Sequence, residues 1–235
     1  RPEARADARL GARLMQGAYG VSTLDGFGTF TRAELIAAAL LFDYLALTQA
    51  GGAARLDPPL RAAPGAFLAI DPATRASLEI DRTTRGSRQG SLTACVDRTV
   101  TAAGARLLAA RLARPSRDVA EITRRLDGVA FFLDATERRE FARDALKRAA
   151  DLERARMRLS LRRGGPRDLA ALAACLNVGE QLCADLSVEP DLPHEIGAAC
   201  QSLSLADKPR LAAFAQMVGA ALAADVPVQA RDGGF

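Results

Sequence analysis

Lysine, the side chain that a phosphate-binding loop requires, occurs at only two positions of this sequence, Lys147 and Lys208. A P-loop places its lysine in the pattern G-x-x-x-x-G-K-[ST], where backbone N–H groups and the lysine surround the phosphates. Neither lysine follows a glycine-rich segment. The sequence therefore carries no P-loop, and we expect this chain not to be an enzyme.

Other residue types that perform chemistry do not form a catalytic or metal-binding pattern. The single histidine, His194, is well separated in sequence from Cys183 and Cys200, whereas zinc ligand pairs normally come about two to four residues apart. Gly26 and Gly28 are the nearest approach to a dinucleotide fingerprint, and their context indicates a surface turn. No serine occupies a G-x-S-x-G elbow. We expect no catalytic, cofactor-binding or metal-binding residue here.

Composition predicts a mainly α fold. Of 235 residues, 50 are Ala, the strongest helix former, whereas Trp is absent and Tyr occurs twice. Hydrophobic residues make up 49% and mean hydropathy is +0.01, which excludes a disordered or collagen-like chain. The length suffices for one large domain or two modest domains with a sizeable core.

Basic charge is concentrated in the middle of the chain. Residues 98–167 contain 18 Lys or Arg and 9 Asp or Glu, whereas the whole chain carries +4. Such a stretch can face the phosphates of nucleic acid. Alternatively, its arginines line solvated helix faces beside acidic partners, as the mixed charges of residues 137–144 indicate. No aromatic side chain is interleaved as a base-stacking platform, and both interpretations stay open.

Apolar periodicity and helix caps organise the first 90 residues. A helix over residues 5–16 is followed by a glycine-rich connection at 17–30, and a capping box of Thr31 with Glu34 begins a second helix. Residues 51–66, rich in Gly and Pro, cannot continue a helix and predict a domain boundary. An extended run at 67–70, a helix over 73–78 and a polar surface loop at 81–90 follow.

Beyond residue 91 the sequence predicts helices almost throughout. They comprise a short turn at 92–96, a helix over 102–112, further helices that begin with the pairs Asp118/Glu121 and Asp134/Glu137, one that begins at Pro166, and one over 203–224. The positions predicted to form their buried faces are Ile122, Leu126, Val129, Ala130, Leu133, Phe141, Ala145, Ala149, Leu152, Leu169, Leu172, Ala173, Leu176, Cys183 and Leu186.

Nothing in the sequence predicts a membrane span or a targeting segment. The longest apolar run, residues 35–42, falls far short of the roughly 20 residues that span a bilayer, and residues 1–13 lack the apolar core of a signal peptide. The four cysteines show no paired close spacing, so we expect small apolar side chains buried in a reducing, cytoplasmic protein. Because the chain begins with Arg1 and not Met, we expect a piece of a longer protein.

Four ordered blocks resemble the DNA mismatch-repair family MutS. Residues 67–80, FLAIDPATRASLEI, are close to the family pattern hxhDxxTxxxLEI. Residues 96–112 resemble Leu-Asp-x-Thr-x-Thr-x-x-Gly-x-Arg-x-Leu, with matches at Asp97, Thr99, Thr101, Gly104, Arg106 and Leu108. Residues 151–154 with 166–169, and then residues 231–234, complete the set. Val96 departs from the usual Leu, and Gly164–Gly165 replace a small-residue pair.

The resemblance implies a domain organisation. Residues 1–52 would be the C-terminal part of an α/β connector domain, residues 53–66 a linker, and residues 67–235 the first part of a helical core, or lever, domain. The family's mismatch-reading, clamp and ATPase parts have no counterpart in these blocks. Thr99 and Thr101 are expected to satisfy local backbone groups, and Gly104 to permit close helix approach.

The resemblance also implies a function. The chain would be the non-catalytic central region of a MutS-like protein, coupling mismatch binding mechanically to the ATPase domain. In the full-length family proteins it implies mismatched double-stranded DNA and MutL as partners, a homodimer, and ATP with Mg²⁺ as cofactors bound outside this region, with no membrane partner. The alternatives are a MutS-like recombination protein and a helical interaction scaffold without a DNA role.

Overall fold

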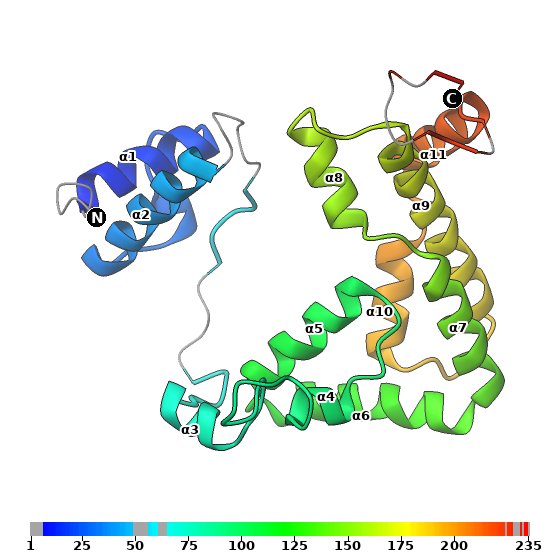
Figure 1. The fold of residues 1–235 in the computed structure, drawn as a ribbon, viewed down its shortest axis with the longest axis horizontal. Coiled ribbons are helices and arrows are strands. Elements are labelled where there is room, and N and C mark those ends of the chain that lie inside the picture. The colour runs from blue at the N-terminus through cyan, green and yellow to red at the C-terminus, as the bar shows by residue number, and fades with distance from the viewer. Residues whose placement is uncertain are drawn as a thin grey trace. The chain divides into compact units, whose positions relative to one another are not determined.

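The computed structural model describes residues 7–48, 56–60, 65–223, 225–227, 231 and 233–234. These residues form helices joined by turns and contain no β-strand, as composition predicts. The described residues contain one isolated antiparallel β-bridge, which joins Phe67 to Ser116. Contacts divide the chain into two units, Arg1–Ala63 and Pro64–Phe235 (Figure 1). The connector, linker and core boundaries stay predictions.

Unit 1 is a helical hairpin. Helix α1 (Ala8–Tyr19) and helix α2 (Arg32–Thr48) pack together, with a 3-10 turn, η2 (Asp25–Phe27), between them. The predicted capping box is confirmed, because the Thr31 backbone N–H donates to Glu34 Oε2 at 2.6 Å and the Glu34 N–H donates to Thr31 Oγ1 at 3.3 Å. The turn around Gly26 and Gly28 lies on the surface, as predicted.

The predicted bounds of the first helix are wrong. The structure begins α1 after Asp7, whose carboxylate accepts a hydrogen bond from the Arg9 N–H, and ends it at Gly20 in the left-handed conformation. Residues 5 and 6 of the prediction lie outside the described residues. Gly17, which the sequence places in the connection, is inside the helix, because one glycine is tolerated there at a modest cost.

Unit 2 consists of nine helices within the described residues: α3 (Pro72–Ser77), α4 (Leu92–Val96), α5 (Ala102–Ala113), α6 (Val119–Asp134), α7 (Thr136–Arg148), α8 (Leu152–Ser160), α9 (Pro166–Leu186), α10 (His194–Leu203) and α11 (Pro209–Ala221). Asp71, Ser91, Thr101, Asp118 and Asp151 cap the starts of α3, α4, α5, α6 and α8 with their side chains. These caps explain why most predicted helix starts are confirmed.

Helix α9 is the centre of unit 2, packing against α7, α8, α10 and α11 (Figure 1). Three of the six positions of its predicted stripe, Ala173, Cys183 and Leu186, are buried, and Leu169, Leu172 and Leu176 are half-buried. By length and composition α9 is the one described helix that could cross a membrane. Four helices pack against α9, so its length and apolar composition are those of a core helix.

The predicted buried face of α6 is wrong. Leu126, Val129 and Leu133 are exposed by 60%, 56% and 66%, and Ile122 and Ala130 are also exposed. Helix α6 packs instead through a neighbouring face, where Gly128, Phe131 and Phe132 meet α10 and the core. The larger aromatic side chains prevail because they bury more apolar area than the aliphatic stripe. The exposed α6 stripe comprises Val119, Ile122, Leu126, Val129 and Leu133.

Two further predictions need correction. The helix predicted to begin at Asp134/Glu137 is expected to bury Phe141, Ala145, Ala149 and Leu152 on one face. Instead α7 ends at Arg148, and Phe141 and Leu152 are exposed, whereas Ala145 is fully buried. Helix α10 was not predicted, since two nearby prolines indicated a break. Pro193 stands just before the first turn, where a missing N–H does no harm.

Candidate functional site

The matched motif of residues 97–104 forms a capped turn. Asp97 Oδ1 accepts hydrogen bonds from the Thr99 N–H at 3.0 Å and the Thr99 hydroxyl at 2.7 Å, and these bonds, with the nearby charges of Arg88 and Arg98, lower the pKa of Asp97. Thr101 Oγ1 accepts from the Gly104 N–H at 2.9 Å. Thr101 therefore satisfies a backbone group as predicted, whereas the Thr99 hydroxyl serves a carboxylate.

The role predicted for Gly104 is wrong. The three atoms nearest to a Cβ at this position all belong to Thr101 and Thr99, at 2.9, 3.6 and 3.7 Å, so no atom of another helix approaches more closely than these. Glycine is therefore suited to the tight cap at the start of α5, where the threonine hydroxyl must reach the backbone. Close approach of a second helix is not its role.

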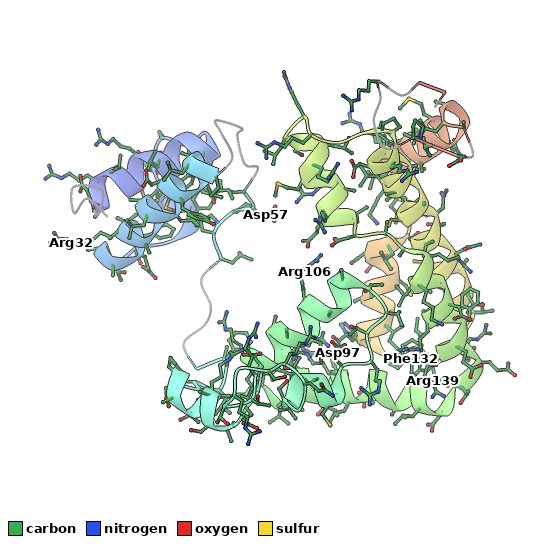
Figure 2. The ribbon with its side chains drawn as sticks, viewed as in Figure 1. Arg32, Asp57, Asp97, Arg106, Phe132 and Arg139 are labelled. Carbon is green, nitrogen blue, oxygen red and sulfur yellow. The ribbon has the colours of Figure 1, made fainter. Side chains whose placement is uncertain are left out.

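Arg106 joins two of the matched blocks. From α5 its guanidinium donates to both carboxylate oxygens of Asp151 at 3.0 Å, and to Glu153 Oε2 at 2.9 Å. Figure 2 shows Arg106 on the side of α5 that faces α8. Asp151 also caps α8 by accepting from the Arg154 N–H. A forked pair of this kind fixes orientation as well as distance, so one side chain ties α5 to the start of α8.

The charges of this bridge reinforce one another. The hydrogen bond from Arg106 is the main cause that lowers the pKa of Asp151, and the same carboxylate raises the pKa of Arg106. The Arg106 side chain is 49% exposed, so solvent screens the attraction. The bridge therefore acts mainly by fixing the position of α5 relative to α8, since Arg106 and Asp151 are 45 residues apart in sequence.

Other arginines of the basic stretch connect helices in the same way. Arg138 on α7 pairs with Asp185 at 2.9 Å and with Glu189 at 2.8 Å, and Arg111 on α5 pairs with Glu195 on α10. The local pairing predicted for residues 137–144 is therefore wrong for Arg138. Its partners lie on and just after α9.

Backbone carbonyls hold two more arginines. Arg139 donates to the Phe132 carbonyl at 2.6 Å, at the corner where α6 meets α7 (Figure 2). Arg143 donates to the carbonyl of Arg98 at 2.9 Å. The only ion pair within α7 among the described residues joins Asp144 to Lys147. We use the name arginine network for Arg106, Arg111, Arg138, Arg139 and Arg143.

A different set of arginines is free of such bonds. Arg156, Arg162 and Arg163 are exposed, and within the described part of the chain no hydrogen bond or ion pair holds their guanidinium groups. They lie on α8 and in the turn that precedes α9. Within the basic stretch 98–167, the arginines of the network thus pair with protein groups, whereas Arg156, Arg162 and Arg163 are available to contact phosphates.

The residues considered for metal binding come only partly together. Cys183 and Cys200 are both buried, and the Cys183 thiol donates to the Cys200 carbonyl at 2.8 Å, while burial raises the pKa of Cys183 to about 11. His194 begins α10. Within the described ranges, no three His, Cys, Asp or Glu side chains gather for a metal ion. Cys95 is exposed, which corrects the prediction that every cysteine is buried.

A hollow in unit 1 offers no group placed for catalysis. A hollow of about 480 Å³ lies between α1, α2 and residues 56–60, and apolar and aromatic side chains line most of it. Glu34 at its edge caps α2, and the Asp57 carbonyl accepts a hydrogen bond from the Tyr19 hydroxyl. These polar groups serve the fold.

A comparison with family models matches residues 73–235 to MutS domain III. The chain belongs to the MutS family. The matched residues lie within unit 2, so the helical body around α9 and its arginine network correspond to that domain. The matched range extends over both blocks that Arg106 joins.

Individual MutS relatives are similar over the whole chain. DNA mismatch repair protein MutS of Caulobacter vibrioides is 47% identical over 238 residues, covering 100% of this chain and 26% of the relative. DNA mismatch repair protein MutS of Azorhizobium caulinodans is 48% identical over 234 residues, covering 100% of this chain and 24% of the relative. The chain thus spans about a quarter of the length of these relatives.

Acid should weaken the bridge between α5 and α8. The pKa of Asp151 is lowered from 3.8, so the unfolded chain binds the proton more tightly than the folded chain. The stabilisation is therefore complete above about pH 4 and is lost as pH falls through the folded pKa. At neutral pH, Asp151→Asn should lower Tm, and this deficit should narrow as pH falls below 4.

Asp127 provides the control for this titration. It is exposed, and in the described residues no hydrogen bond or ion pair involves its carboxylate. Thermal unfolding of wild type, Asp151→Asn and Asp127→Asn should be followed at several pH values by far-UV circular dichroism. A deficit of Asp151→Asn that stays constant down to pH 2 would contradict the role of the charged carboxylate.

Proposed function

We propose that this chain is the non-catalytic central region of a MutS-like DNA mismatch repair protein and that it couples DNA binding to ATP hydrolysis. Within this proposal, mismatched duplex DNA, MutL and a second MutS subunit are partners of the longer protein. ATP and Mg²⁺ bind outside these residues, and the protein acts in the cytoplasm. The match to MutS domain III and the names of the relatives support this assignment.

The observation that carries the coupling is the Arg106 bridge. Arg106 links α5 to α8, Arg138 links α7 to the end of α9, and Arg111 links α5 to α10. Helices joined by packing and directed ion pairs move together, so a displacement at one end biases the other. A set of helices cross-linked in this way is suited to transmitting a displacement between two sites, whereas it offers no arrangement of catalytic groups.

The relatives' names favour repair over the two alternatives. Both relatives reported above are named as mismatch repair proteins, which supports the repair branch over a recombination protein. A helical scaffold without a DNA role has no observation in its favour. A gene replacement separates all three possibilities.

The experiment exchanges a segment between two proteins. The matching quarter of the Caulobacter vibrioides relative is replaced by this chain, and the chimera is expressed in a strain that lacks mutS. We expect the mutation frequency to return close to that of the strain with intact repair. A chimera that accumulates normally but leaves the mutation frequency high would contradict the proposal.

Arg106→Gln in the same chimera tests the coupling itself. The variant should keep its basal ATP turnover and its affinity for mismatched DNA, because Arg106 contacts neither ligand in this proposal. The change in ATP turnover on adding mismatched DNA should shrink about fivefold or more, since coupling energies of 1–3 kcal/mol correspond to factors of about 5–150.

Arg124→Gln is the matched control. Arg124 is an exposed arginine of α6, and no ion pair or hydrogen bond of its side chain occurs in the described part of the chain. Its variant should respond to mismatched DNA as the unmodified chimera does. An unchanged response in Arg106→Gln would remove the bridge from the mechanism.

A further inference from the structure

Unpaired positive charge gathers on α8 and on the turn that follows it. From residue 154 to residue 167 the sequence holds six arginines and no Asp or Glu. Arg156, Arg162 and Arg163 are exposed and, among the described residues, take part in no ion pair. In Figure 1, this turn lies at the end of α8 that points away from α5 and α6.

Hydrogen bonds hold the turn in place. Asp168 Oδ2 accepts from the Gly165 N–H at 2.9 Å and from Arg158 Nε at 3.2 Å. The backbone N–H of Arg163 donates to the Arg158 carbonyl at 2.8 Å, and Arg162 has a left-handed φ of 56°. The two free arginines of the turn therefore project from a fixed backbone, which lowers the entropic cost of binding.

Another contact lies just beyond the turn, at the start of α9. Arg167 Nε donates to the carbonyl of Val226 at 2.8 Å, so this guanidinium is anchored by one nitrogen. Arg154 lies in the field of Asp151, whose pKa it helps to lower. Within the described ranges, the guanidinium groups of Arg156, Arg162 and Arg163 thus form no ion pair, whereas those of Arg154, Arg158 and Arg167 are partly balanced or anchored.

We propose that α8 and the α8–α9 turn form a contact surface for the sugar-phosphate backbone of duplex DNA. This inference rests on the proposed function and names one place where the core of the protein meets its DNA. Arg156 lies on α8, and Arg162 and Arg163 lie in the turn directly after it, so this surface offers three guanidinium groups for up to three phosphates. Guanidinium groups bind phosphate oxygens in forked pairs.

The chemistry predicts binding without sequence preference. Residues 151–175 contain no aromatic side chain, so the surface has no platform on which unpaired bases could stack. Phosphate contacts position a protein on DNA but do not read its bases. Duplex DNA should therefore bind at least as well as single-stranded DNA of equal length.

The test compares two triple variants of this chain with the same change in charge. R156Q/R162Q/R163Q removes the proposed contacts. R85Q/R124Q/R210Q removes three exposed arginines from the 81–90 loop, α6 and α11, and in the described residues these also lack ion pairs. Glutamine keeps side-chain length, and Tm by circular dichroism checks that both variants fold.

Affinity for a short fluorescein-labelled duplex is measured by anisotropy between 50 mM and 200 mM NaCl. Three phosphate contacts should account for a fall in affinity of about 40-fold over this range. R156Q/R162Q/R163Q should bind about tenfold or more weakly at low salt, with a slope of log K against log [salt] reduced by about three. The control triple should stay within about twofold of wild type.

Each other outcome overturns the inference. An equal loss in both triples would mean that net charge alone drives binding, and no loss in either would place the contact elsewhere. Binding to poly-glutamate instead of duplex DNA would indicate an acidic protein partner. If the triple loses no DNA affinity while the chimera still repairs mismatches, this surface fails and the proposed function stands.

Discussion

Replacing Leu182 by alanine should lower the free energy of unfolding of unit 2 by about 2–5 kcal/mol. Leu182 is 5% exposed on α9 and packs in one cluster with Ala142, Ala145 and Val178. The substitution removes apolar contacts and leaves a cavity among α7 and α9 side chains that cannot collapse fully. Guanidinium chloride unfolding followed by far-UV circular dichroism measures the loss.

Leu126→Ala is the matched control, because it makes the same chemical change on α6. Leu126 is 60% exposed, so little apolar area returns to water and the cost should stay within about 0.5 kcal/mol. The sequence alone predicts the opposite for Leu126, since periodicity puts it on a buried stripe. Equal costs at Leu126 and Leu182 would contradict the observed packing of α6.

The α6 stripe shows where sequence periodicity reaches its limit. A repeat of apolar residues reveals that a helix has an apolar face, and the start of α6 at Asp118 was predicted correctly from its cap. Periodicity does not reveal which of two apolar faces is covered. Here Phe131 and Phe132 pack into the core, and their position relative to α10 depends on tertiary contacts that no local pattern contains.

The arginine network shows the same limit at the candidate site. The sequence matched Arg106 to one family block and Asp151 to another, but nothing in their spacing places them 3.0 Å apart. For Arg138, nearby acidic residues favoured local pairs, while its partners Asp185 and Glu189 are 47 and 51 residues away. Long-range partners follow from helix packing, so charge patterning within one helix could not predict them.

Local signals were more reliable where a single side chain determines the backbone. Thr31 with Glu34 predicted a capping box, and both hydrogen bonds are present. Pro166 predicted the start of α9 because a proline at the first helical position loses no hydrogen bond. Interactions between residues a few positions apart can therefore be predicted from sequence patterns. Interactions between two helices far apart in sequence cannot.

Gly11→Ala should destabilise unit 1 by about 1–3 kcal/mol, as overpacking of a close contact does. A Cβ atom at this position would clash with the Leu35 carbonyl oxygen and would lie 3.3 Å from the Ala39 nitrogen. These are backbone atoms of α2, so relief requires the two helices to separate. That separation also disturbs Met15 and Ala39, which are buried in the hairpin.

Gly17→Ala is the control on the same helix. Nothing lies within 4 Å of a Cβ atom at Gly17, so the added methyl group should instead stabilise α1 by about 0.5–1 kcal/mol through helix propensity. Tyr19 and Tyr44 are the only tyrosines of the sequence and both belong to unit 1. Because Trp is absent, tyrosine fluorescence during urea unfolding follows unit 1 specifically. Stabilisation by both substitutions would refute close packing of α1 on α2 at Gly11.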